Sequence, residues 1–238
     1  MRYLWATATH VGHVRKVNED AVHPELDGRG PGPIVVAVAD GMGGHAAGDV
    51  ASRIAIETAL GKVDEGVPAP DLVAAANEAV LAAVEANQAF GGMGTTMTLA
   101  IFDEHGVMHL GHVGDSRAYL LRDGALRQVT KDHTLVAELV ALGRLSAEAA
   151  RTHPQRHMVT RALGTPDVAV DGIELTVLPG DRVLLCSDGL TGMVPDPKIS
   201  RILTDFEGPD AAAWSLVEAA NAAGGVDNTT VAIVDVVA

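Results

Sequence analysis

Residues 33–44 read PIVVAVADGMGG, in which seven apolar residues in a row are followed by Asp40 and Gly41. An unbroken apolar run is typical of a β-strand buried on both faces, because a half-exposed strand alternates apolar with polar residues. We therefore expect a strand at 33–39 that delivers Asp40 and Gly41 at its end. Neighbouring segments must supply the layers that bury it.

Further strands and helices are predicted on both sides of this run. Strands are expected at residues 3–10, 168–178, 182–187 and 229–237, and helices at 49–60, 71–90 and 209–223. Asp71 follows Pro70, and we expect its side chain to cap the second helix. The pattern predicts a mixed chain of helices and strands with no internal repeat.

Four short alternating segments occupy the middle of the chain, at residues 95–102, 107–113, 117–122 and 125–130. Turn sequences at 104–106 and 123–124 join them, which predicts an antiparallel meander. Beyond it, two short helices are expected at 135–142 and 146–151. They lie in a polar excursion that ends near residue 160, and we call residues 135–160 the flap because the excursion is a candidate mobile segment.

Composition bounds the size of the protein and its partners. The sequence has 238 residues, 47% of them hydrophobic, which suits one compact domain over residues 1–238. The formal net charge of −14 opposes contact with nucleic acid or an anionic membrane, so neither partner is expected. Cys186 is the only cysteine, which excludes an internal disulfide and fits a reducing compartment. With no signal peptide and no apolar run of about eighteen residues, we expect a cytoplasmic location.

Carboxylates recur at the ends of the apolar segments. Asp40, Asp115, Asp188 and Asp227 each lie at or near such an end, and Glu19-Asp20 lies near the start of the chain. Aspartate and glycine are common turn formers, which would explain any one of the four. Their recurrence favours a shared site, where close carboxylates would repel one another without cations. Oxygen ligands of this kind suit Mg²⁺ or Mn²⁺ better than zinc.

Six short motifs follow one another along the chain. They are GHVRKVNED at 12–20, DGMGGH at 40–45, GTT at 94–96, GDSR at 114–117, SDGL at 187–190 and DNTT at 227–230. In order and spacing, from about residue 7 to the C-terminus, they resemble the signature series of bacterial type 2C metal-dependent protein serine/threonine phosphatases, the PPM family. Each motif alone is weak, whereas six in order are highly specific.

The resemblance implies a fold and a metal centre. The implied fold is α+β: a four-layer α-β-β-α sandwich with two central antiparallel sheets flanked by helices. The implied cofactors are Mn²⁺ or Mg²⁺, two or three ions per chain. In that family an aspartate like Asp40 bridges two ions; here the Gly41 carbonyl would complete one site, while Asp188 and Asp227 would hold the other.

The remaining motif residues take supporting roles in this resemblance. Glu19 and Asp20 would bind or orient metal-bound waters. Asp115, with Asp188 shared, resembles the third metal site of bacterial members. Arg15 matches the family's phosphate-binding arginine, whose planar fork can hold two phosphate oxygens. The alternative is that Arg15 is a surface residue paired with Glu19 or Asp20.

The family's chemistry follows from its metals. Two ions about 3.5 to 4 Å apart lower the pKa of a shared water, so hydroxide attacks phosphorus in line and no covalent phosphoenzyme is needed. The departing alkoxide needs a proton. Animal members carry a histidine directly after the Asp-Gly pair, where this chain has Met42. His45 is the nearest substitute as general acid, and metal-bound water is the other option.

Three other features have simpler explanations. His109 and His112 lie three apart in a predicted strand, so they point to opposite faces and are interpreted as structural. Cys186 lacks the downstream arginine cradle of cysteine-dependent phosphatases and is interpreted as a core residue. His157 and Arg161 resemble family positions that stabilise the flap, or are surface residues.

The resemblance favours hydrolysis of phosphoserine and phosphothreonine on proteins. The expected partners are phosphorylated proteins, among them serine/threonine kinases and their substrates, and we expect a monomer. Two alternatives stay open. One is a partner-switching phosphatase of sigma-factor regulation, and the other is a catalytically silent binding module with the same fold.

Overall fold

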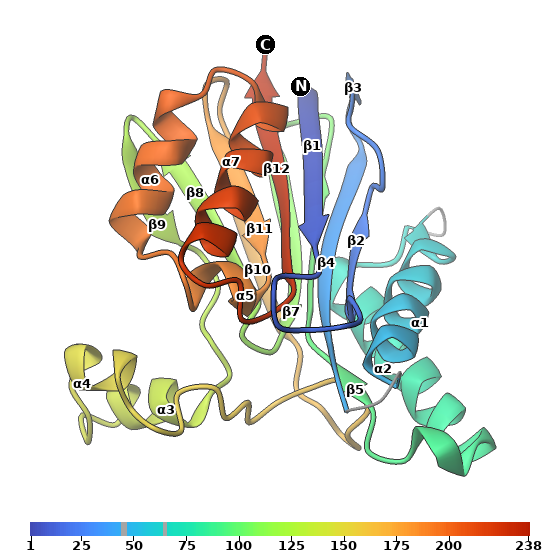
Figure 1. The fold of residues 1–238 in the computed structure, drawn as a ribbon. Helices are drawn as coiled ribbons and strands as arrows, with labels where there is room; N and C mark the ends of the chain where they lie inside the picture. The colour runs from blue at the N-terminus through green and yellow to red at the C-terminus, as the bar shows by residue number, and fades with distance from the viewer. Residues whose placement is uncertain (44–46, 64–65) are drawn as a thin grey trace.

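The apolar run at 33–39 forms most of β4 (Ile34–Met42), an inner strand of one of two β-sheets. The computed structural model describes residues 1–43, 47–63 and 66–238 (Figure 1). Within β4, Val36 and Val38 are buried against the other sheet, while Ala37 and Ala39 are buried against helices. The strand is therefore covered on both faces, as its sequence predicts.

Two antiparallel sheets pack face to face. The first sheet has the order β3 (Gly28–Pro31), β1 (Arg2–His10), β12 (Thr229–Val237), β11 (Arg182–Cys186), β8 (Arg117–Arg122) and β9 (Ala125–Gln128). The second has the order β10 (Asp171–Thr176), β7 (Val107–Val113), β6 (Met97–Phe102), β4 and β2 (Asp20–His23), and β5 (Gly94–Thr95) pairs with β4. Tyr3, Phe102 and Leu185 belong to the apolar layer between the sheets.

Helices cover both outer faces of this pair (Figure 1). On the second sheet lie α1 (Gly48–Leu60) and α2 (Ala69–Ala86), which is followed by a short 3-10 helix, η2 (Gln88–Phe90). On the first lie α5 (Asp188–Thr191), α6 (Asp196–Asp205) and α7 (Pro209–Ala222). The expected four-layer α-β-β-α sandwich is thereby confirmed.

The flap forms a separate projection, drawn in yellow in Figure 1. It contains α3 (Leu135–Ala141) and α4 (Ala147–Arg151), capped by the hydroxyls of Thr134 and Ser146. Its two ends are held together, because the Leu135 N–H donates to the Met158 carbonyl over 2.9 Å. Both predicted helices are confirmed, whereas the mobility of the flap stays a prediction.

The expected meander is wrong, because its four segments belong to different sheets. β6 and β7 pair in the second sheet, whereas β8 and β9 pair in the first. The chain crosses between the sheets just after β7, where Gly114 has a φ of 110° and lies against Thr96. The turns predicted at 104–106 and 123–124 each join a pair of strands within one sheet, but no predicted turn marked the crossing after β7.

Several element boundaries also differ from the sequence prediction. Asp71 does not cap α2, since the helix begins at Ala69 after Pro68 and the Asp71 side chain makes no capping bond. β10 is shorter than the predicted 168–178. The short elements β2, β3 and α5 were not predicted, because their sequences lack a long apolar run or a clear period. The sequence analysis also missed α6, although its Ile199, Ile202 and Leu203 recur at helical spacing. No helix in the described ranges is long and apolar enough to cross a bilayer.

Candidate active site

Five aspartates from both sheets meet at one end of the sandwich. Asp40 of β4 lies directly opposite Asp20 of β2 in the second sheet. Asp115 follows β7, Asp188 follows β11 as the first residue of α5, and Asp227 lies two residues before β12. Asp40 experiences the charges of the other four. The fold therefore brings these strand ends together, as the shared site expected from the sequence requires.

Burial makes this cluster electrostatically costly. Loss of solvent raises the pKa of Asp40 well above the usual range, and the neighbouring carboxylates raise it further. Burial, followed by the charge of Asp188 and others, raises the pKa of Asp115 to about 7. The pKa of Asp20 is raised for the same two reasons. Without a counter-charge, the protein cannot keep all these carboxylates ionised near neutral pH.

The oxygen atoms of this cluster suit a hard divalent cation. Asp20 Oδ1 is buried and has no hydrogen-bond partner among the described residues, so it is free to accept one from a water or to face a cation. Among the residues that the structure describes, no three His, Cys, Asp or Glu side chains lie close enough together to enclose a metal ion by themselves. Mg²⁺ and Mn²⁺ do not need such a cage, because waters and carbonyls complete their octahedra. The residues present therefore fit these ions.

Glycines let the backbone close around Glu19. A Cβ on Gly41 would collide with the carbonyl oxygens of Gly48 and Glu19. A Cβ on Gly48 would lie 2.7 Å from Glu19 Oε1. The Gly41 N–H donates to the Glu19 carbonyl over 3.1 Å. Only glycine at both positions allows the β4 end, the α1 start and Glu19 to approach this closely.

Two threonines that the sequence analysis left without a role hold Asp40 in place. The Asp40 N–H donates to Thr96 Oγ1 over 3.0 Å, and the Asp40 carbonyl accepts from the Thr96 N–H and from Thr95 Oγ1. Thr96 Oγ1 also lies 2.7 Å from Ser116 Oγ, beside Asp115. This threonine thus joins two of the aspartates through buried hydrogen bonds. The motifs at 94–96 and 114–117 signalled these residues, but not their partners.

Arg15 lies at the exposed edge of the cluster. Its Nη2 donates to Asp227 Oδ2 over 2.8 Å, and its Nη1 lies 3.8 Å from Glu19 Oε2. The side chain is 47% exposed, so its fork is accessible to a ligand that approaches the carboxylates. Both interpretations of Arg15 find a basis here, because it pairs with an acid of the cluster and also faces solvent.

Asn228 fixes the loop that carries Arg15 and Glu19. Its Oδ1 accepts from the Glu19 N–H over 2.8 Å, and its Nδ2 donates to the carbonyls of Val11 and Val17, each over 3.0 Å. The side chain is almost fully buried. One asparagine next to Asp227 therefore ties the β1–β2 loop to the start of β12, a role that sequence spacing did not reveal.

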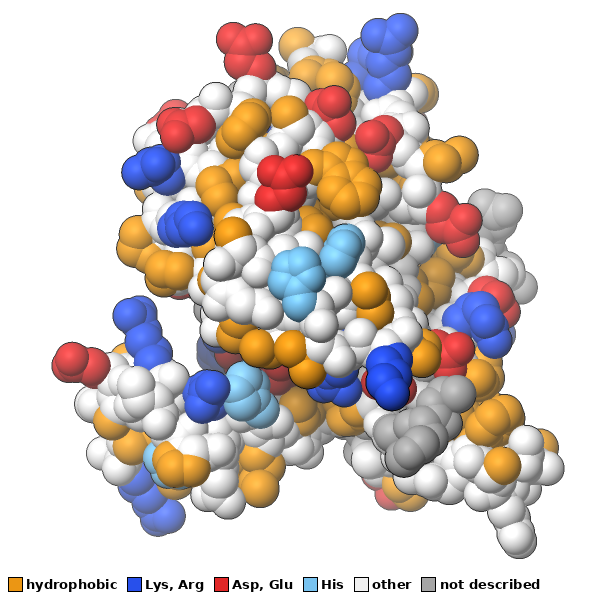
Figure 2. Space-filling model, viewed as in Figure 1, with side chains coloured by type: hydrophobic (Ala, Val, Ile, Leu, Met, Phe, Trp, Pro, Cys, Tyr) orange, Lys and Arg blue, Asp and Glu red, His pale blue; other side chains and the backbone are white. Residues whose placement is uncertain are grey.

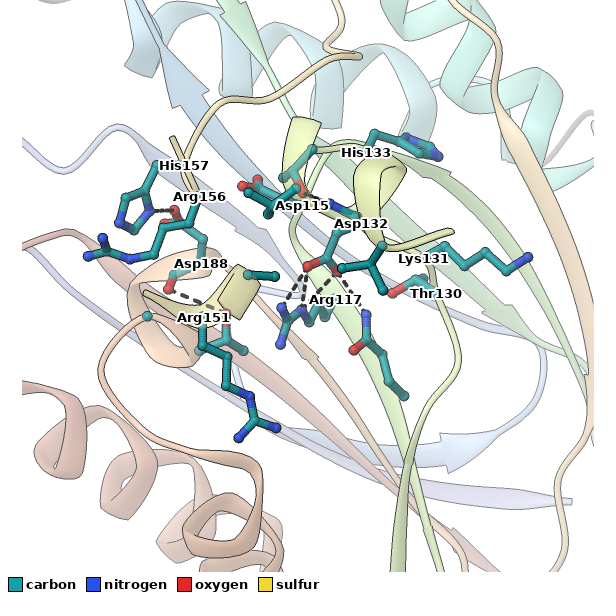
Figure 3. A pocket seen from close by; sticks show the side chains of 18 of the residues that line it. Asp115, Arg117, Thr130, Lys131, Asp132, His133, Arg151, Arg156, His157 and Asp188 are labelled. Atoms are coloured by element: carbon teal, nitrogen blue, oxygen red, sulfur yellow. Dashed lines mark hydrogen bonds and ion pairs between the residues drawn. The ribbon is translucent and has the colours of Figure 1, made fainter. Parts of the chain in front are cut away.

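The flap meets the cluster through His157. Its Nδ1 lies 3.7 Å from Asp188 Oδ2, and this contact raises the pKa of the imidazole (Figure 3). Arg161, at the base of the flap, lies 3.2 Å from Asp171 Oδ1 and 3.3 Å from His133 Nε2. Both residues are thus near the site, where the resemblance placed them.

Other candidate residues have the following positions. His45 lies outside the described residues. His112 is buried between Thr98 and the Lys131 carbonyl, while His109 on the opposite face is half-exposed, which agrees with structural roles. Burial raises the pKa of the Cys186 thiol to about 12, so this residue stays protonated in the core.

Comparisons with known proteins agree with this geometry. Residues 9–222 match the family model described as Protein phosphatase 2C. The chain belongs to the protein phosphatase 2C family. The serine/threonine protein phosphatase PstP of Mycobacterium tuberculosis is 44% identical over 98% of this chain, and the chain spans 45% of that protein. The serine/threonine phosphatase stp of Listeria monocytogenes is 40% identical over 95% of this chain and 93% of its own length.

Solved structures of this family share the fold. The crystal structure of the M. tuberculosis phosphatase PstP/Ppp has a TM-score of 0.91 and 40% identity, with 100% of both chains covered. A structure of the PstP catalytic domain in complex with two manganese ions has a TM-score of 0.88 and 40% identity, also with 100% coverage of both chains. The sandwich is therefore the fold of a protein phosphatase 2C domain.

In metal-free protein, stability should fall as pH rises from about pH 4 to pH 7. The raised pKa of Asp115 means that the folded state binds more protons than the unfolded state across this interval, so raising the pH favours unfolding. Urea unfolding with excess chelator measures the effect. Asp115→Asn should flatten part of the slope, because the amide does not titrate. An unchanged slope in that variant would contradict a raised pKa at Asp115.

Thr96→Val should lower the free energy of unfolding by about 1–3 kcal/mol, because the buried Asp40 N–H and Ser116 hydroxyl lose a partner while the volume is kept. Urea denaturation at fixed pH and metal concentration measures the loss. Thr152→Val, at an exposed flap position, is the matched control. Equal effects of the two substitutions would show that the Thr96 hydrogen bonds contribute nothing specific.

Proposed function

We propose that this chain hydrolyses phosphoserine and phosphothreonine on proteins with two or three bound Mn²⁺ or Mg²⁺ ions. The observation that carries the proposal is the convergence of five aspartates from both sheets, whose mutual repulsion a bound cation would relieve. Membership in the protein phosphatase 2C family supports it. So do the names of the relatives, which include serine/threonine phosphatases and a PstP domain in complex with two manganese ions.

In this proposal each residue keeps the role that the resemblance implied. Asp40 and the Gly41 carbonyl would hold one ion, and Asp40, Asp188 and Asp227 would hold the other. Such ions, when bound, activate water and neutralise phosphate charge. The close contacts among Gly41, Gly48 and Glu19 support this placement, because they hold the backbone at Gly41 against that of Glu19.

Supporting residues surround this pair of sites. Glu19 and Asp20 orient waters, and the unpartnered Asp20 Oδ1 is the atom available for that task. Asp115, with Asp188, contributes a third site. Arg15 binds the phosphate through its guanidinium fork, in place of part of its contact with Asp227.

The reaction breaks the bond between phosphorus and the ester oxygen while a water oxygen adds to phosphorus. The leaving serine or threonine oxygen takes up a proton, and His45 is proposed as its donor, with water as the alternative. No cysteine takes part, because the only thiol is buried and protonated.

The proposed partners are phosphorylated proteins, including serine/threonine kinases and their substrates, and the proposed location is the cytoplasm. We propose that the protein acts as a monomer and that residues 1–238 form a single catalytic domain. Hydrolysis itself separates this proposal from a silent binding module, which would bind phosphopeptides without releasing phosphate.

With Mn²⁺, the protein should release phosphate from an aryl phosphate and from a phosphothreonine peptide. Excess chelator should abolish both activities, and Asp188→Ala should lower them at least about a hundredfold, since the ion loses a ligand. Asp205→Ala, at the exposed end of α6, is the matched control and should retain activity. Activity that survives chelation or the Asp188 substitution would refute the metal-dependent mechanism.

His45→Ala should separate the two leaving groups. A phenolate can leave without a proton, whereas a threonine alkoxide needs one. The kcat should therefore fall about a hundredfold for the peptide and little for the aryl phosphate. Steady-state kinetics on both substrates measure the difference. If both rates keep their ratio, the proton comes from water instead.

A further inference from the structure

A cavity of about 1000 Å³ opens beside the aspartate cluster (Figure 3). Its lining includes Asp115 and Asp188, residues of the flap, and Asp196 at the start of α6. Part of the lining is apolar, contributed by Val136, Val140, Ala150, Met193 and Pro195. Its size is at the upper end of the range for ligand sites, so a short peptide segment can enter it.

Two basic residues of this cavity are already engaged. Arg117 holds Asp132 through Nε and Nη2, over 2.8 and 2.6 Å. Arg161 pairs with Asp171. In each pair the aspartate neutralises the arginine, so neither arginine offers an unpaired charge to a ligand.

Two other arginines in the lining are free. Arg151 and Arg156 are exposed, and neither has a carboxylate within 4.0 Å in the part of the chain that the structure describes. Arg156 directly precedes His157, which contacts Asp188. In Figure 3 the two arginines lie on either side of Asp188. Lys131 of the lining is likewise exposed and has no such partner among the described residues, so three unpaired cations line the cavity, two of them on the flap.

Their position contrasts with the charge of the whole protein. The chain carries a net charge of −14, yet the flap at 135–160 has three arginines against two glutamates. One of these glutamates, Glu138, is bonded to the Thr160 hydroxyl over 2.7 Å. The lining as a whole also holds six carboxylates, Asp115, Asp132, Glu138, Asp171, Asp188 and Asp196. The attraction for an anionic side chain is therefore confined to the unpaired cations, and Figure 2 shows blue Lys and Arg side chains on the flap at its lower left.

We propose that this cavity binds the residues on one side of the phosphorylated serine or threonine, and that Arg151 and Arg156 select acidic side chains there. This inference rests on the proposed function, because it assigns the substrate sequence that the same site prefers. A phosphate held near Arg15 and the aspartates leaves the adjoining peptide beside Asp115 and Asp188. The apolar lining accepts its backbone and aliphatic groups, while the two arginines meet its carboxylates.

The test compares phosphothreonine peptides that differ only in charge. Peptides with acidic residues before the phosphothreonine, with acidic residues after it, and with alanine at all of these positions are assayed with Mn²⁺. One of the two acidic peptides carries its acidic residues on the side that enters the cavity. Its kcat/KM should be about five- to twentyfold above that of the alanine peptide. This preference should shrink at high salt, because exposed charges are screened.

Variants assign the preference to the arginines. Arg151→Gln and Arg156→Gln should each lower the ratio of acidic to alanine peptide about two- to fivefold. Arg156→Glu should lower it further, through repulsion. Arg127→Gln, an exposed arginine of β9 outside the cavity lining, is the matched control and should leave the ratio as it is.

Three results would overturn the inference. The first is a wild-type protein without preference between acidic and alanine peptides. The second is a preference that the double glutamine variant retains. The third is a loss of aryl phosphate hydrolysis equal to the loss on the acidic peptide, because the arginines would then act on the phosphate or on folding.

Failure of the proposed function has a different signature. In that case the wild type releases no phosphate from any phosphopeptide with Mn²⁺. Fluorescence anisotropy with labelled peptides then reads the same charge preference as a ratio of Kd values without turnover. A Kd ratio that is equal for acidic and alanine peptides would again refute the cavity's role.

Discussion

Mutual repulsion among buried carboxylates is the constraint on which the active end of this protein depends. Aspartates from both sheets point to one place, and burial raises the pKa of several of them. Such an arrangement persists only if the surrounding backbone cannot relax. The threonine bonds around Asp40 and the asparagine bonds beneath Glu19 supply that rigidity. The repulsion lowers the free energy of unfolding at this edge, and burial of side chains in the three apolar layers behind it offsets that loss.

Two sheets are needed because neither carries the whole site. The second sheet contributes Asp20 and Asp40, while the first contributes the residues around Asp188 and Asp227. The Thr96–Ser116 contact lies where the chain passes from one sheet to the other. Packing between the sheets therefore sets the distance between halves of the proposed metal centre, so core packing and catalysis are coupled.

Prediction from sequence succeeded where a local pattern determines the structure. The run at 33–39 indicated a strand buried on both faces because it has no polar alternation, and the ordered motifs indicated the aspartates. Prediction failed where residues far apart in the sequence determine the structure. The placement of β7 and β8 in different sheets depends on the crossing at Gly114, and the role of Asn228 depends on partners more than 200 residues away. The helix α6 was missed for a different reason, because its amphipathic period spans only ten residues.

The alternation within β4 has a consequence for how this family can diverge. Val36 and Val38 face the other sheet, but Ala37 and Ala39 face the helices, and their small side chains let α1 come close. The same approach brings Gly48 against Gly41. A single added methyl group at position 39 would act as a spacer beneath the helix and tilt its first turn away from the carboxylates. Selection for ion affinity can thus act on the thickness of a hydrophobic layer, without a change in any ligand.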